Sequence, residues 1–156
     1  MSWGLAWILL ALLALMLLAA CWFDLRSRTI PNELCLAVAL LAIPFWWATG
    51  LTIWPDAALQ VGVAALVFGL FAAAFAIGAM GGGDVKLVSA VALWLPWPAV
   101  LALLVIMSLA GGVLTIALAL RHRLARRETR LEIPYGVAIA FGGLWLIGQR
   151  FLYQFG

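Results

Sequence analysis

The carboxylates of Asp24 and Asp84 are the side chains in this sequence that are best placed to do chemistry. The chain has 156 residues, of which 68% are hydrophobic and 10% are charged, against about 25% charged in an ordinary soluble domain. Each aspartate lies where a long apolar segment meets a short polar loop. An ionisable side chain at membrane depth is costly, so it is a candidate functional group by default. The two aspartates are therefore the first candidates for a site.

The glycines Gly81–Gly83 directly precede Asp84 and remove three side chains beside its carboxylate. Glycine permits close approach of another backbone. Two neighbouring carboxyl groups have separated pKa values, because like charges repel. One group therefore holds a proton while the other can accept one from water. Such a pair performs general acid–base hydrolysis of a peptide bond, as in aspartic proteases. Asp84 starts an expected helix and Asp24 ends one, so the helix dipoles favour an ionised Asp84 and a protonated Asp24.

Several other chemistries lack the residues they need. A Ser/His/Asp triad requires a histidine, and His122 lies in an arginine-rich loop. The sequence has neither an HExxH motif nor a phosphate loop, and Cys21 and Cys35 form no CxxC pair, so we expect no metal site. The low charge argues against nucleic-acid binding. Two alternatives remain. One is a transporter or proton relay with paired aspartates, and the other is a membrane scaffold in which the aspartates only cap helices or pair with basic side chains.

The hydrophobic pattern predicts an all-α membrane protein. Apolar runs of about 20 residues are typical of transmembrane helices, and the nine Trp residues fit interfacial belts. The segment at 84–94 is short, is followed by Pro96, and could be re-entrant instead of spanning. We expect one integral-membrane domain over residues 1–156 with about six transmembrane helices. The six apolar segments cover about residues 3–23, 32–48, 57–79, 84–94, 98–120 and 134–153.

The basic residues predict the orientation of the chain in the membrane. Of its nine Lys and Arg residues, only Arg150 lies outside the loops 24–33, 80–86 and 121–133. The positive-inside rule places these three loops in the cytoplasm. Both termini are then outside, and both aspartates face the cytoplasm. We also expect the loop 121–133 to contact anionic lipid headgroups.

Three motifs together resemble those of the type IV prepilin peptidases, which are GxGD-type intramembrane aspartyl proteases. The first is D-x5-IPN, which runs from Asp24 to Asn32. The second is GGGDVKL at residues 81–87, and the third is PYGVAIAFGG at residues 134–143. GxGD alone is a weak signal, whereas both aspartate motifs in this order, with PYG downstream, are specific. The resemblance covers nearly the whole chain.

The resemblance implies the roles of the site residues. Asp24 and Asp84 would be the catalytic pair of an intramembrane aspartic endopeptidase. Lys86 would tune Asp84 or bind lipid. The substrate cleft would be formed by Gly81, Gly82, Gly83, Lys86, Pro134, Tyr135 and Gly136.

The resemblance also implies the reaction and the partners. The substrate would be a prepilin, with a basic leader ending in Gly and then an apolar helix. It would be cut after that Gly at the cytoplasmic face of the bacterial inner membrane, for pilus biogenesis. Larger family members carry a cytoplasmic loop with paired CxxC motifs and also N-methylate the new terminus. This sequence has no such loop, so it looks like the peptidase-only branch of Flp/Tad-type pili, without methyltransferase activity, and the resemblance implies no cofactor. Archaeal preflagellin peptidases are the nearest competing substrate class.

Overall fold

The structure, a computed structural model, describes residues 2–124 and 134–155, and these residues form helices without any strand. The all-α prediction is therefore confirmed. The elements are α1 (Trp3–Ser27), α2 (Asn32–Thr49), the short turn η1 (Ile53–Ala57), α3 (Ala58–Ala76), α4 (Gly82–Ala92), α5 (Trp97–Leu124) and α6 (Tyr135–Phe155).

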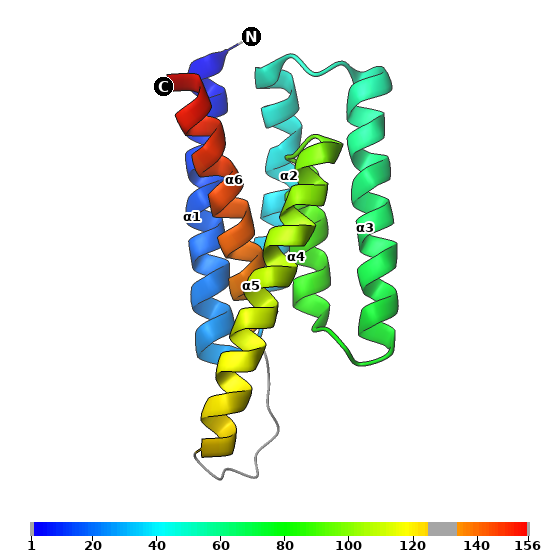
Figure 1. The fold of residues 1–156 in the computed structure, drawn as a ribbon. Coiled ribbons are helices and arrows are strands. Elements are labelled where there is room, and N and C mark those ends of the chain that lie inside the picture. Colours follow the sequence, from blue (N-terminus) through cyan, green and yellow to red (C-terminus); the bar gives the residue numbers. More distant parts are fainter. Residues whose placement is uncertain (1, 125–133, 156) are drawn as a thin grey trace.

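The helices run up and down, so that the predicted cytoplasmic segments share one end of the bundle. Figure 1 shows the α1–α2 and α3–α4 connections at the lower end, where α5 also ends and α6 begins. The start of α1, the α2–α3 connection and the end of α6 lie at the upper end. Most of the arginine-rich loop 121–133, on which the lipid-headgroup prediction falls, lies outside the described residues.

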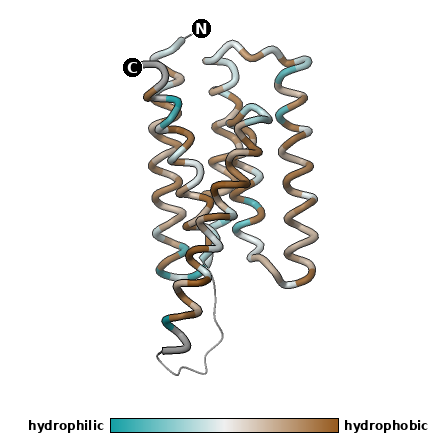
Figure 2. Tube along the Cα trace, viewed as in Figure 1, coloured by the Kyte–Doolittle hydropathy of each residue, from teal (hydrophilic) through white to brown (hydrophobic). Residues whose placement is uncertain are grey.

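Four helical segments in the described part of the chain are long and apolar enough to cross a membrane. They are Trp3–Ser27, Asn32–Thr49, Ile53–Ala76 and Trp97–Arg121. Figure 2 shows hydrophobic residues along most of their length, with hydrophilic residues concentrated towards the two ends. The 11 residues of α4 rise about 16 Å at 1.5 Å per residue, against a hydrocarbon core of about 30 Å. The chain is thus a multi-pass helical protein with four candidate spans.

The short helix α4 lies at the centre of the packing and contacts α2, α3 and α6, while α6 contacts α1, α4 and α5. From Asp84 to Ala92, every residue of α4 except Lys86 is buried. A Cβ added at Gly143 of α6 would lie 2.7 Å from Leu17 Cδ1 of α1. Small residues permit such close helix approach in membranes. The packing of α1, α4 and α6 therefore positions both aspartates.

Two tryptophans attach the end of α4 to α2. Trp46 Nε1 donates to the Leu93 carbonyl at 2.7 Å, and Trp94 Nε1 donates to the Val38 carbonyl at 2.8 Å. Trp94 is only 1% exposed and packs against Phe45 at 4.9 Å between ring centroids. The expectation of interfacial belts is therefore wrong for Trp94, because its indole N–H finds a carbonyl partner inside the protein.

Candidate active site

Asp24 lies in the last turn of α1, and its carboxylate reaches the start of α6. The side chain is buried, at 4% exposure. Its Oδ2 accepts the backbone N–H of Val137 at 3.1 Å. Val137 is the third residue of α6, so Asp24 satisfies one of the free N–H groups at that helix terminus. The positive end of the α6 dipole therefore faces this carboxylate.

Gly136 makes this approach possible. A Cβ at Gly136 would lie 2.8 Å from Asp24 Oδ2 and 2.8 Å from Ile30 Cδ1. Side chains essentially never tolerate such distances, so any larger residue would force a shift of the neighbouring atoms. The structure thus brings Gly136, predicted as a cleft residue, directly against the carboxylate of Asp24.

Asp84 is the third residue of α4 and is 8% exposed. Its Oδ1 is buried and has no hydrogen-bond partner among the described residues. A Cβ at Gly81 would lie 2.8 Å from Asp84 Oδ2, and a Cβ at Gly83 would lie 3.2 Å from Ile30 Cβ. The glycine run therefore lets the loop fold closely around the carboxyl group of Asp84.

Both carboxyl groups line one small cavity of about 190 Å³. The backbone N–H of Gly136 interacts with both of them. Burial raises the pKa of Asp84 from 3.8 to about 7, and the nearby charge of Asp24 adds to the rise, while the N–H groups of Gly81 and Gly136 oppose it. The other residues that line the cavity are Arg28, Thr29, Ile30, Asn32, Gly81, Gly82 and Gly83.

The geometry favours the opposite proton assignment to the one expected from the sequence. Asp24 has a backbone N–H that holds its ionised form, whereas Asp84 has a buried oxygen without a partner. The sequence argument considered only the C-terminal end of Asp24's own helix. In the structure, the N-terminus of α6 lies against the same carboxylate, and this supports an ionised Asp24 beside a protonated Asp84.

This arrangement predicts how stability depends on pH. Asp84 binds its proton more tightly in the folded chain, with a pKa of about 7, than at its ordinary value of 3.8. Below both values the group has no effect. As pH rises from 3.8 towards 7, the unfolded chain ionises first, so the free energy of unfolding falls. Thermal unfolding in detergent is expected to show this fall, and Asp84→Asn is expected to flatten it.

The exposed Asp56, near the start of α3, provides the control for this measurement. Its Oδ2 accepts the hydroxyl of Thr52 at 2.8 Å, away from the cavity. The variant Asp56→Asn should retain the wild-type dependence of unfolding on pH. An equal flattening in both variants would contradict the role given to Asp84.

The remaining predicted cleft residues do not line this cavity. The Lys86 Nζ donates to Asn32 Oδ1 at 2.7 Å, and this bond links α4 to the first residue of α2. Pro134 is buried, and the ring of Tyr135 packs beside Gly111 of α5, at 3.4 Å from an added Cβ.

The sequence analysis did not single out Arg28, Thr29 or Val137. Arg28 ends α1 with a left-handed φ of 55°, which lets the chain turn beside Asp24. Val137 contributes only a backbone N–H, which leaves no signal in the sequence. In the described part of the chain, no three His, Cys, Asp or Glu residues cluster closely enough to hold a metal ion.

The fold and the site define a multi-pass helical membrane protein with a buried pair of aspartates. The chain belongs to the type IV leader peptidase family, whose model matches residues 11–116. This match includes Asp24 and Asp84 and confirms the resemblance seen in the sequence. Family membership and the four apolar helices together indicate a multi-pass inner-membrane protein.

A curated relative and the solved structures complete these comparisons. Over 147 residues the chain is 29% identical to a protein of Pectobacterium carotovorum subsp. carotovorum named prepilin leader peptidase/N-methyltransferase. The alignment covers 92% of this chain and 50% of the relative, so the chain spans about half the relative's length. No solved structure matches the chain significantly.

Proposed function

We propose that this chain is an aspartic endopeptidase that removes the leader peptide of type IV prepilins. The observation that carries the proposal is the shared cavity of Asp24 and Asp84 in a member of the type IV leader peptidase family. The cut falls after the Gly that ends the leader, at the cytoplasmic membrane face, before pilus assembly. The name of the curated relative supports the substrate class.

The proposed mechanism uses the two carboxyl groups in different protonation states. Ionised Asp24 accepts a proton from water as the water oxygen attacks the scissile carbonyl carbon. Protonated Asp84 donates its proton to the carbonyl oxygen, which becomes a hydroxyl in the tetrahedral intermediate. Collapse of the intermediate returns the hydroxyl proton to Asp84, while Asp24 gives its proton to the leaving amine. Both carboxyls then regain their starting states. Gly81–Gly83, which line the same cavity, contact the extended substrate backbone.

We further propose a single integral-membrane domain with about six membrane-embedded helices and both termini outside. Support comes from the basic loops 24–33 and 80–86, which share one end of the bundle with the end of α5 (Figure 1). We expect Thr52→Cys to react with a membrane-impermeant maleimide in intact spheroplasts and Ser27→Cys only after permeabilisation. The native Cys21 and Cys35 would be replaced by Ser. Labelling of Ser27→Cys from outside would reverse this orientation.

The narrower substrate class that we propose is the Flp/Tad type, without N-methylation of the product. The support is the lack of a CxxC pair in this sequence. Transfer of a labelled methyl group from S-adenosylmethionine to the cleaved pilin would contradict this part. Preferential cleavage of an archaeal preflagellin over a Flp-type prepilin would overturn the proposed substrate class.

The direct test is co-expression with a Flp-type prepilin, followed by electrophoresis and N-terminal sequencing of the product. Wild type should yield a shorter pilin whose sequence begins after the leader Gly. The Asp24→Asn/Asp84→Asn double variant, at equal membrane abundance, should leave the prepilin uncut. A wild type that yields no shorter product, or a double variant that yields the same product, refutes the proposed activity and favours a proton relay or scaffold.

A further inference from the structure

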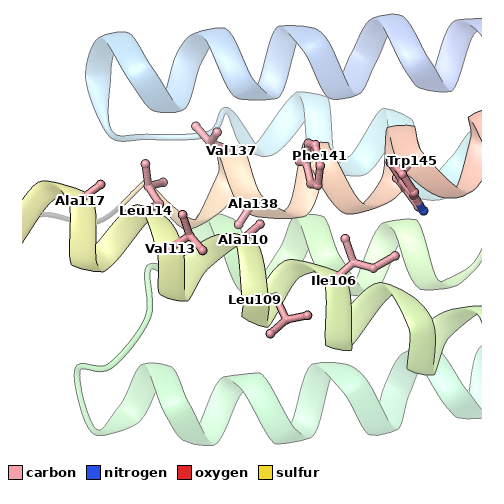
Figure 3. Close-up of a pocket in the computed structure, with 10 residues that line it drawn as sticks. All are labelled: Ile106, Leu109, Ala110, Val113, Leu114, Ala117, Val137, Ala138, Phe141 and Trp145. Carbon is pink, nitrogen blue, oxygen red and sulfur yellow. The ribbon is translucent and has the colours of Figure 1, made fainter.

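A long apolar groove lies between α5 and α6, beside the candidate active site. Its volume is about 670 Å³, and every residue that lines it is apolar. Figure 3 shows its lining side chains, which come from both helices, with those of Ala110 and Ala138 between the two. We call it the α5–α6 groove. Its lining includes Ile106, Leu114 and Ala117 of α5 and Val137, Phe141 and Trp145 of α6.

The groove begins at a residue that also contacts the aspartate pair. The side chain of Val137 lines the groove, and its backbone N–H donates to Asp24 Oδ2 at 3.1 Å. The preceding residue, Gly136, has a backbone N–H that interacts with both carboxyl groups. A chain held at the two aspartates therefore meets the groove around the first turn of α6.

The shape of the groove fits a helical segment. The α5 residues from Ile106 to Ala117 cover about 16 Å of helix axis, roughly three helical turns. On α6, Val137, Phe141 and Trp145 recur at intervals of four and so share one face. Phe141 and Trp145 are 52% and 50% exposed, and their rings lie 6.2 Å apart. They offer a broad unfilled apolar wall to an incoming helix.

The packing leaves this groove open to a partner. Among the described elements α5 contacts mainly α6, so the rest of its length is not covered by the bundle. The groove lining also contains the small residues Ala110, Ala117 and Ala138. Within a bilayer, helices associate by van der Waals packing, and small residues allow their backbones to approach closely. The groove is thus suited to a transmembrane helix.

We propose that the α5–α6 groove receives the apolar segment that follows the scissile bond of the substrate. The proposal rests on the proposed function and deepens it, because it assigns a surface to the part of the prepilin that stays in the membrane. With the scissile bond at Asp24 and Asp84, the following residues run around the first turn of α6 and along Val137, Phe141 and Trp145.

Photo-crosslinking tests the occupant of the groove independently of cleavage. A photoreactive amino acid is placed at Leu114, which lines the groove, or at Ile116, which is 71% exposed on the same helix and does not line it. Both changes are made in the Asp84→Asn background with a co-expressed Flp-type prepilin. We expect about ten times more prepilin adduct at Leu114 than at Ile116, which corresponds to a preference of the prepilin segment for the groove by about 1.4 kcal/mol. Equal labelling at both positions, or adducts at Leu114 only with lipid or a second copy of the chain, overturns the proposal.

A cleavage assay tests the same surface through substrate length. Ala117→Trp fills the groove, and Ile116→Trp adds the same volume to the same helix outside it. Ala117→Trp should raise the KM for the full prepilin about tenfold and leave kcat unchanged. It should not affect a peptide that ends shortly after the scissile bond. The proposal is overturned if Ala117→Trp raises the KM equally for the full prepilin and the short peptide, or if Ile116→Trp raises the KM for the full prepilin as much as Ala117→Trp does. Failure of the wild type to cut either substrate refutes the proposed function. The crosslinking result still decides whether the prepilin occupies the groove.

Discussion

Asp84→Asn is expected to reduce prepilin cleavage by a factor of about 10²–10⁴, the usual contribution of a general acid or base. The amide has nearly the same shape as the carboxyl group, so the side chain still fits beside Gly81. Asp84 Oδ1 has no hydrogen-bond partner in the described part of the chain, so the change removes the transferable proton without breaking a bond seen there. Asp24→Asn should have a similar effect, because its amide oxygen can still accept the Val137 N–H but cannot take up a proton. The measurement is the rate of product formation at matched membrane abundance.

The control for both variants is Asp56→Asn, which removes a carboxylate at the other end of the bundle, where it accepts the Thr52 hydroxyl. Its cleavage rate should equal that of wild type. Thermal unfolding of each variant separates a chemical effect from a loss of fold. Wild-type cleavage by either single aspartate variant would break the proposed pair, since the mechanism needs both groups.

Gly136→Ala is expected to give the second-largest loss of activity, about 10²-fold, because geometric misplacement by about 1 Å can have such an effect. The new Cβ would lie 2.8 Å from Asp24 Oδ2, 2.9 Å from Asp24 Cγ and 2.8 Å from Ile30 Cδ1. Either the carboxylate must rotate away from Val137 or the start of α6 must move. Overpacking of this kind destabilises a protein by about 1–3 kcal/mol. Initial cleavage rates and thermal unfolding measure the two effects.

Gly148→Ala is the matched control on the same helix. A Cβ at Gly148 meets nothing within 4 Å, and alanine favours a helix over glycine by about 1 kcal/mol. This variant should cleave normally and unfold at a slightly higher temperature. Adding Ile30→Val to Gly136→Ala removes the Cδ1 contact, so it should restore part of the stability but little activity. Full activity in Gly136→Ala would show that the position of Asp24 does not depend on this glycine.

The sequence predicted the helices well, because helices depend on local patterns, and the two candidate aspartates line one cavity. All six apolar segments became helices, with ends that differ from the prediction by a few residues. The largest shift at the site is in α1, which continues past Phe23 to Ser27. Asp24 therefore lies in the last turn of the helix and not in the loop that follows it. The number of membrane spans was less predictable: in the described part of the chain four segments have the length and apolar character to cross, so the count of about six stays a prediction.

The proton assignment could not be predicted because it depends on a contact between distant parts of the chain. The bond from the Val137 N–H to Asp24 joins α6 to α1, 113 residues apart in sequence. A backbone N–H carries no sequence signal, and the expected effect of α1's own C-terminus on Asp24 pointed the other way. Trp94 was misjudged for a similar reason, since its partner is the carbonyl of Val38 on another helix.

The short length of α4 has a consequence for the surrounding lipid. Its 11 residues span about 16 Å, roughly half of the hydrocarbon thickness of a typical bilayer. In Figure 1 the turn from α4 into α5 lies below the upper ends of the neighbouring helices. Since α4 itself is buried, lipid meets the exposed turn at its end, residues 96–98. Bilayers adapt to a shorter apolar surface by local thinning, so we expect the bilayer to be thinnest beside this turn. Electron-microscopy density of the protein in lipid nanodiscs would reveal such a dent, and a flat bilayer around α4 would rule it out.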